Sequence, residues 1–227
     1  MSDFQNANLL AIDTATATLR LAVGFGGDRV IKTAQDVQRS HGLVLLKMID
    51  DILKSAEIPR EKLQGLVVGT GPGSFTGLRI GLAAAKGIAV ALDIPVVGLS
   101  LFDLAAALLP PEQVQLVVPF KRDQVFVGPV ENGQWSAATI QPVSLSELSD
   151  RLIDRTAVGI CLNVSDFVPG VATPRIGGRI EYDSADLLRL GRERLSAGSG
   201  DDLAGLEPLY LQRSQAEIRF DQGHQDI

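Results

Sequence analysis

Residues 69–81, GTGPGSFTGLRIG, are the stretch that decides the fold. They follow an apolar run and lead into a long apolar segment that ends near Leu92. A Walker phosphate loop needs a lysine directly after its last glycine, and none is present. A dinucleotide-binding loop needs the spacing G-x-G-x-x-G, whereas the first three glycines here are spaced by twos. The stretch is therefore interpreted as a tight strand-to-helix turn with Ser74 as the helix cap, although an anion could still approach that helix end.

The helix predicted over residues 74–92 has few charged residues. Arg79, Lys86 and Asp93 follow each other at a spacing of seven and form one narrow seam on a surface of apolar residues and glycine. A helix of this kind is covered on several sides. Small residues on successive turns, Gly77, Gly81, Ala84 and Ala85, would let another backbone come close. Either a partner chain or a second domain supplies the cover, and the composition favours a partner.

The rest of the first half alternates between strand and helix patterns. Short apolar or alternating runs predict strands over residues 8–12, 19–25, 30–36, 63–68 and 94–99. Residues 41–58 have a helical period, and Ser100 with Asp103 forms a capping box for a further helix. Pro110 and Pro111 stop that helix. We therefore expect two domains, residues 1–109 and 110–227.

The second half repeats this pattern more weakly. It shows strand patterns at 114–118, 125–130 and 158–162, a hairpin turn at Asn132-Gly133 before Trp135, and helix patterns at 144–153 and 185–195. Ser144 and Glu147 are a second expected capping box. The tail from Gln212 has no clear pattern.

Charge and composition exclude some functions. The net charge is −6 and arises in the second half, so the chain lacks the basic surface of a protein that binds nucleic acid alone. There is no cationic leader with an apolar core, and a cytoplasmic location is expected. The single cysteine, Cys161, lies in an apolar run and is interpreted as core rather than as a reactive thiol.

Candidate catalytic residues are few. Asp13 ends a buried strand, where it would serve either as a functional carboxylate or as a turn cap. His41 and His224 are the only histidines, so a zinc site of usual spacing is not expected. No G-x-S-x-G motif is present. The residues by themselves indicate a scaffold without an assembled active site.

Three blocks resemble the TsaB (YeaZ) family, the bacterial partner of the tRNA-modifying enzyme TsaD. They are LLAIDTATATLRLAV (residues 9–23), HGLVLLKMIDDILKSAEI (41–58) and GTGPGSFTGLRIGLAAAKGIAVALDIPVVGLS (69–100), and the third is the most specific. PLYLQR, residues 208–213, resembles the C-terminal pattern of the family. PFKRDQVFVG, residues 119–128, stands where the family has an Asp-Ala-Arg run and keeps only Arg122 of that run.

The resemblance implies an α/β fold of the actin-like and Hsp70-like (ASKHA, ribonuclease H-like) type. Two related domains would each combine a mixed sheet with crossover helices. Asp13, Thr14 and Thr16 then correspond to the first phosphate loop, D-x-G-[ST], but Ala15 replaces its glycine and hinders close approach of a phosphate. The chain also lacks an equivalent of the histidine pair that holds the metal in TsaD. We accordingly expect a non-catalytic paralogue with no catalytic residue and no metal site.

The implied function is to bind TsaD and to support, with the ATPase TsaE, transfer of a threonylcarbamoyl group from its adenylate to the adenosine beside the tRNA anticodon. The family forms a homodimer in the absence of TsaD, and tRNA would be contacted only through the complex. Binding of ATP or ADP is left open only within that complex, and no membrane association is implied.

The same resemblance places the dimer contact on the helices of the first domain. The expected interface residues are Leu43, Val44, Leu46, Met48, Gly77, Ile80, Gly81, Ala84 and Ile88. Two other classes stay open: an ATP-dependent enzyme or kinase of the same fold, and a peptidase, which the missing metal ligands disfavour.

Overall fold

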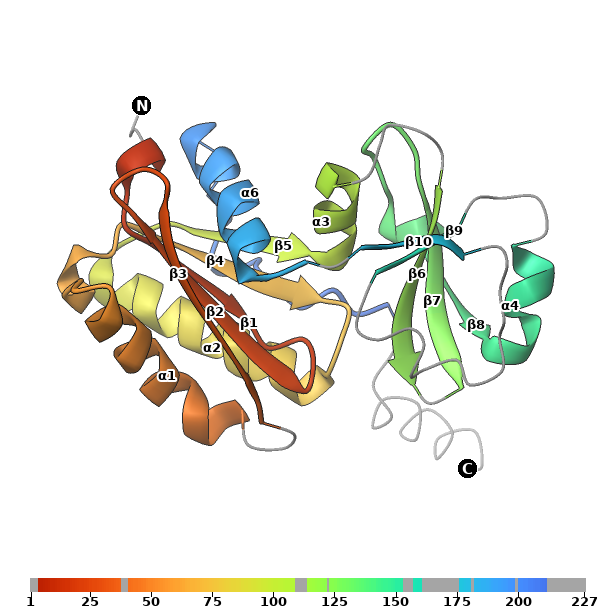
Figure 1. The fold of residues 1–227 in the computed structure, drawn as a ribbon, viewed down its shortest axis with the longest axis horizontal. Coiled ribbons are helices and arrows are strands. Elements are labelled where there is room, and N and C mark those ends of the chain that lie inside the picture. The colour runs from red at the N-terminus through yellow and green to blue at the C-terminus, as the bar shows by residue number, and fades with distance from the viewer. Residues whose placement is uncertain are drawn as a thin grey trace, which may run out of the picture.

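The computed structural model describes residues 4–37, 41–108, 114–121, 123–152, 157–160, 176–180, 182–198 and 200–211 of the 227-residue chain. Two five-stranded sheets lie side by side, with helices on their faces (Figure 1). Cys161, His224 and Arg122 lie outside the described residues, as does the diproline at 110–111.

The first sheet has the strand order β3-β2-β1-β4-β5. β2 pairs antiparallel with β1 and β3, whereas β4 pairs parallel with β1 and β5. The three strands predicted over residues 8–12, 19–25 and 30–36 are thus confirmed, and they form an antiparallel meander. The strands are β1 (Leu9–Asp13), β2 (Thr18–Phe25), β3 (Arg29–Asp36), β4 (Gly65–Gly71) and β5 (Val96–Ser100).

The second sheet has the order β10-β9-β6-β7-β8, which is the order of the first sheet when it is read from β8. β7 pairs antiparallel with β6 and β8, and β9 pairs parallel with β6 and β10. The weak repeat of the sequence is therefore a real structural repeat. The strands are β6 (Val114–Lys121), β7 (Gln124–Val130), β8 (Gln141–Ser144), β9 (Ala157–Ile160) and β10 (Ile176–Ile180).

Helices cover both faces of the first sheet because its central strands, β1 and β4, are buried on both sides. Leu10 and Ile12 of β1 belong to the core under α1 (His41–Ser55) and α2 (Phe75–Leu92). Leu9 and Ala11 point to the other face and belong to the core under α3 (Leu101–Leu108) and α6 (Ser184–Ser196). Figure 1 shows α1 and α2 on one side of this sheet and α6 on the other.

The core on the α3–α6 side continues into the second half of the chain. Leu116 and Phe126 of the second sheet belong to the same buried cluster as α3 and α6. The opposite face of the second sheet packs on Leu148 and Leu152, which lie in and just after α4 (Leu145–Arg151). The remaining helical turns are η1 (Phe4–Asn6), η2 (Arg60–Lys62) and η3 (Ala137–Thr139).

Helix α6 comes from the range 110–227 but packs on β1, β2 and β4 of the first sheet. The chain therefore returns to its first half after completing the second sheet. The division of the chain into domains 1–109 and 110–227 stays a prediction.

Several local predictions are confirmed. The Ser74 side chain accepts a hydrogen bond from the Gly77 N–H at 3.2 Å and caps α2. Ser100 and Asp103 form the expected capping box, with the Asp103 N–H donating to Ser100 Oγ at 3.0 Å. Asn132 and Gly133 have positive φ, as a two-residue hairpin turn requires. For Ser144 and Glu147, the structure records no reciprocal cap.

By length and mean hydropathy, α2 could also cross a membrane. Its 18 residues have a mean hydropathy of 1.5, and 33% of them are buried. Among the described residues it is the one helix with this property, which is weak evidence because a core helix passes the same test. Here α2 lies on the sheet against β4.

Candidate functional site: the Asp13 turn and the α1–α2 face

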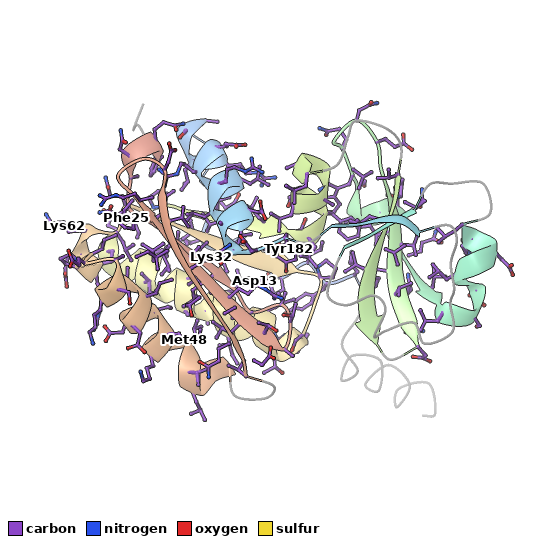
Figure 2. The ribbon with its side chains drawn as sticks, viewed as in Figure 1. Asp13, Phe25, Lys32, Met48, Lys62 and Tyr182 are labelled. Atoms are coloured by element: carbon purple, nitrogen blue, oxygen red, sulfur yellow. The ribbon has the colours of Figure 1, made fainter. Side chains whose placement is uncertain are left out.

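Asp13 lies at the end of β1, and both of its carboxylate oxygens have partners. Oδ1 accepts a hydrogen bond from the Ala15 N–H at 2.9 Å. Oδ2 accepts one from the Tyr182 hydroxyl at 2.8 Å, and Asp13 is 2% exposed. Figure 2 shows Tyr182 beside Asp13, between the two halves of the molecule. Of the two roles left open for Asp13, the geometry matches the turn cap.

Tyr182 was not found by sequence reasoning. It lies 169 residues away from Asp13 along the chain, between β10 and α6. No local pattern marks a tyrosine as the partner of a distant carboxylate. The Arg20 guanidinium lies 5.7 Å from the centre of the Tyr182 ring and adds a cationic group to this junction.

The other two residues of the expected vestigial phosphate loop are also bonded within the chain. The Thr14 hydroxyl donates to the carbonyl of Gly77 at 2.8 Å, and Thr14 is fully buried. The Thr16 hydroxyl accepts from the Thr18 N–H at 3.1 Å and from Arg20 at 2.9 Å. The turn thus directs its polar groups inward.

The glycines of the opening stretch allow α2 to lie directly on this turn. A Cβ on Gly73 would come closer than 3.0 Å to the carbonyl oxygen of Ala15, and Cβ atoms on Gly77 and Gly81 would do the same to oxygens of Thr14. The Ser74 N–H also donates to the Ala15 carbonyl at 2.7 Å. The N-terminal turn of α2 therefore packs against the backbone of the Asp13 turn. This is the helix end that the sequence left open to an anion.

This packing corrects part of the expected interface. Gly77 and Gly81 face Thr14 inside the chain, and Met48 is buried in the core under α1. The two glycines allow close backbone approach and the Met48 side chain fills the core, so we remove these three residues from the proposed surface.

The other expected interface residues lie on the outer side of the two helices. Leu43 is 86% exposed and Leu46 is 63% exposed, and Val90, which sequence reasoning missed, is 71% exposed. Four further residues are half-buried and lie between these exposed side chains and the core: Val44, Ile80, Ala84 and Ile88. We call this set the α1–α2 face: Leu43, Val44, Leu46, Ile80, Ala84, Ile88 and Val90. A helical wheel that placed Ala83, Gly87 and Val90 on one side of α2 would have identified Val90 from the sequence.

The charged residues of α1 are paired with each other beside this face. Lys47 bonds Asp51, and Asp50 bonds both Lys54 and Arg60. Hydrogen bonds from Lys54 and then Arg60 lower the pKa of Asp50, and the same contact with Asp50 raises the pKa of Lys54. The apolar face is thus bordered by charges that neutralise one another.

A pocket of about 460 Å³ lies where α3, α6 and the 131–134 turn meet. Its polar groups are already engaged: Asp103 accepts hydrogen bonds from Trp135 at 3.2 Å and from Arg194 at 2.9 Å. The Phe102 ring stacks on Trp135 at 5.1 Å. This arrangement fits a structural junction better than a substrate site. In the described part of the chain, no three His, Cys, Asp or Glu side chains come together as a metal site would need.

Comparison with known proteins gives consistent relatives. A family model described as TsaD, tRNA N6-adenosine threonylcarbamoyltransferase, matches residues 32–143. The tRNA threonylcarbamoyladenosine biosynthesis protein TsaB of Haemophilus influenzae is 37% identical over 115 residues, a match that spans 50% of this chain and 48% of that protein. The Bacillus subtilis protein of the same name is 26% identical over 231 residues, covering 93% of this chain and 97% of that protein.

A solved structure has the same fold. It is described as an uncharacterized protein from Pseudomonas aeruginosa with similarity to peptidase YEAZ, and it superimposes with a TM-score of 0.70 at 24% identity, covering 91% of this chain and all of the other.

The duplicated mixed sheet, with helices that cross between strands and return from the second half to the first, is an α/β fold, and the Pseudomonas aeruginosa structure has the same fold. In sequence, the chain is similar to TsaB proteins. In fold, it is similar to structures described as YeaZ or as similar to YeaZ.

Proposed function

We propose that the chain is a non-catalytic, cytoplasmic partner of a TsaD-type tRNA N6-adenosine threonylcarbamoyltransferase. Its role in forming threonylcarbamoyladenosine in tRNA is supported by the names of its relatives. In this proposal it supports transfer of the threonylcarbamoyl group from threonylcarbamoyl-adenylate to the adenosine beside the anticodon, together with TsaE. It reaches tRNA only through the complex, and without TsaD it forms a homodimer.

The observation that carries the proposal is the α1–α2 face. This face lies on the opposite side of the first sheet from α3 and α6, and therefore away from the packed junction with the second half. In the described part of the chain, nothing covers Leu43, Leu46 or Val90. Full burial of one such side chain contributes about 1.5–3 kcal/mol, which favours a partner on this face.

The Asp13 turn supports the non-catalytic part of the proposal. In a catalytic relative this carboxylate would face a metal or a phosphate, whereas here it accepts hydrogen bonds from Ala15 and Tyr182. The space beside the turn is filled by the backbone of α2. The Asp13 carboxylate thus serves the internal packing of the chain, and in this proposal the transfer chemistry belongs to TsaD.

The test is co-purification of this chain with the TsaD of the same organism. Leu46→Glu places a charge in the centre of the α1–α2 face and should abolish the complex, because a buried unpaired carboxylate costs several kcal/mol. Val30→Glu is the matched control, because Val30 is an exposed apolar residue on β3 and should tolerate the same change.

Modification of tRNA is then measured with TsaD, TsaE and each variant. Activity that depends on wild-type chain and fails with Leu46→Glu supports the proposal. Wild-type chain that neither binds TsaD nor raises tRNA modification would contradict it.

A further inference from the structure

Arg79 on α2 is held by two aromatic residues at the surface. Its guanidinium carbon lies 3.9 Å from the centre of the Phe75 ring, and its Nε donates a hydrogen bond to the Tyr210 hydroxyl at 2.9 Å. The two rings are 5.3 Å apart. Phe75 is 39% exposed and Tyr210 is 42% exposed, although both are large aromatic residues.

This guanidinium is oriented, and within the described part of the chain it has no counter-ion. Among the residues that the structure describes, the cation of each recorded ion pair is a lysine or arginine other than Arg79, and no carboxylate pairs with Arg79. A guanidinium has five N–H donors in a planar fork, and the Tyr210 bond uses one of them. The stacked ring and the Tyr210 bond restrict its rotation, so the outward donors are preorganised for a planar oxyanion.

Arg79 lies in line with the α1–α2 face. Phe75, Arg79, Ala83, Gly87 and Val90 are exposed residues of α2 at spacings of three or four, which puts them on one side of the helix. Val90 at the far end is a member of the α1–α2 face. The Arg79 cluster is therefore the charged end of one continuous surface.

The composition of this surface favours a protein over RNA. Affinity for RNA comes from several cations that each contact a phosphate, but the chain carries a net charge of −6 and the other cation of α2, Lys86, is half-buried two turns away. Arginine and tyrosine with apolar neighbours are the residues that dominate binding energy in protein interfaces. We propose that Arg79, positioned by Tyr210 and Phe75, binds a carboxylate of the partner protein at the end of the α1–α2 face.

This inference rests on the proposed function, and one titration tests both. Binding of the purified chain to TsaD from the same organism is measured at low and high salt for wild type, Arg79→Met and Tyr210→Phe. Methionine keeps an apolar side chain over the Phe75 ring and removes the N–H donors of the guanidinium group. Arg79→Met should weaken binding by about tenfold or more and reduce its dependence on salt. Tyr210→Phe keeps the ring and releases Nε, so it should weaken binding less than Arg79→Met.

Arg29→Met is the matched control. Arg29 also stacks on an aromatic ring, that of Phe25 at 4.5 Å, and its loss changes the net charge equally. It lies at the start of β3, away from α2, and should leave affinity for TsaD unchanged. Thermal unfolding of each variant confirms that the fold is kept, and Tyr210→Phe serves as the readout if Arg79→Met is destabilised.

Four results would overturn the inference. If Arg79→Met binds TsaD with wild-type affinity, the inference is wrong but the proposed function still stands. An equal loss in Arg29→Met would show a general charge effect. Weaker binding of an anticodon stem-loop RNA to Arg79→Met, with unchanged binding of TsaD, would assign the cluster to RNA. If wild-type chain does not bind TsaD at all, the proposed function fails and the inference fails with it.

Discussion

A buried hydrogen bond between Asp13 and Tyr182 is one of the contacts that join the two halves of the chain. The carboxylate is 2% exposed and the tyrosine is 8% exposed, so water cannot replace either partner easily. The Asp13 carboxylate thus has a structural partner within the chain. The contact depends on the second half of the chain being folded and correctly placed.

Removal of the Tyr182 hydroxyl should destabilise the folded protein. We expect Tyr182→Phe to lower the free energy of unfolding by about 2 kcal/mol, because one oxygen of a buried carboxylate loses its partner. Urea denaturation measures this change. Tyr210→Phe is the comparison, since its hydroxyl bonds an exposed arginine and its loss should cost under about 1 kcal/mol. Equal effects of the two variants would contradict a special role for the buried pair.

At the level of elements, α2 rests on the Asp13 turn through the glycines of residues 69–81. The glycine spacing that resembled a phosphate loop instead lets a helix approach backbone, because Gly77 and Gly81 share one side of α2 and Gly73 lies just before the helix. The outer side of the same helix is free for the proposed partner. One helix therefore serves both the core and the α1–α2 face.

A pair of alanine substitutions separates these two sides. Gly81→Ala should destabilise the protein by about 1–3 kcal/mol, because its Cβ would overlap the buried Thr14 side chain. Gly87→Ala should be neutral or stabilise it by up to about 1 kcal/mol, because a Cβ there meets no atom within 4 Å and alanine favours the helix. Chemical denaturation of both variants measures the difference, and effects of the same sign would refute this packing.

Over the whole molecule, α6 carries the chain back from the second sheet to the first. Asp183 caps α6 by accepting the Ala185 N–H at 2.7 Å, and its carboxylate also bonds Lys32 on β3. Figure 2 shows Lys32 in front of the first sheet, near the start of α6. Burial raises the pKa of Asp183, but the hydrogen bond from Lys32 and the backbone N–H donors outweigh it, and the net pKa lies below the usual value of 3.8.

This lowered pKa gives a pH dependence of known sign. A carboxyl group with a folded-state pKa below its unfolded value contributes stability above the unfolded pKa, and that contribution is lost as pH falls through the folded value. Asp183→Asn keeps the cap and removes the charge, so it should cost up to about 1 kcal/mol at pH 7. The difference from wild type should shrink below about pH 4. Unfolding free energies at pH 7 and pH 3 test this, and a difference that grows in acid would contradict it.

Much of the fold could be predicted from local patterns. The strand runs of the first half, the caps at Ser74 and Ser100, and the Asn132-Gly133 turn all have short-range causes that the structure confirms. The candidate site was predicted in part. Leu43 and Leu46 lie on an exposed face, but Gly77, Gly81 and Met48 are internal, because a helical wheel does not say which apolar side meets the sheet.

The sequence by itself determined the mixed α/β class, the repeat of the strand pattern and the absence of a working phosphate-loop spacing, because these depend on period, turn residues and spacing within a few positions. Only the tertiary structure decided that Tyr182 bonds Asp13, that α6 returns to the first sheet, and that Arg79 meets Tyr210. Each of these contacts joins residues more than 100 positions apart. Their formation depends on how both halves pack, which no local pattern records.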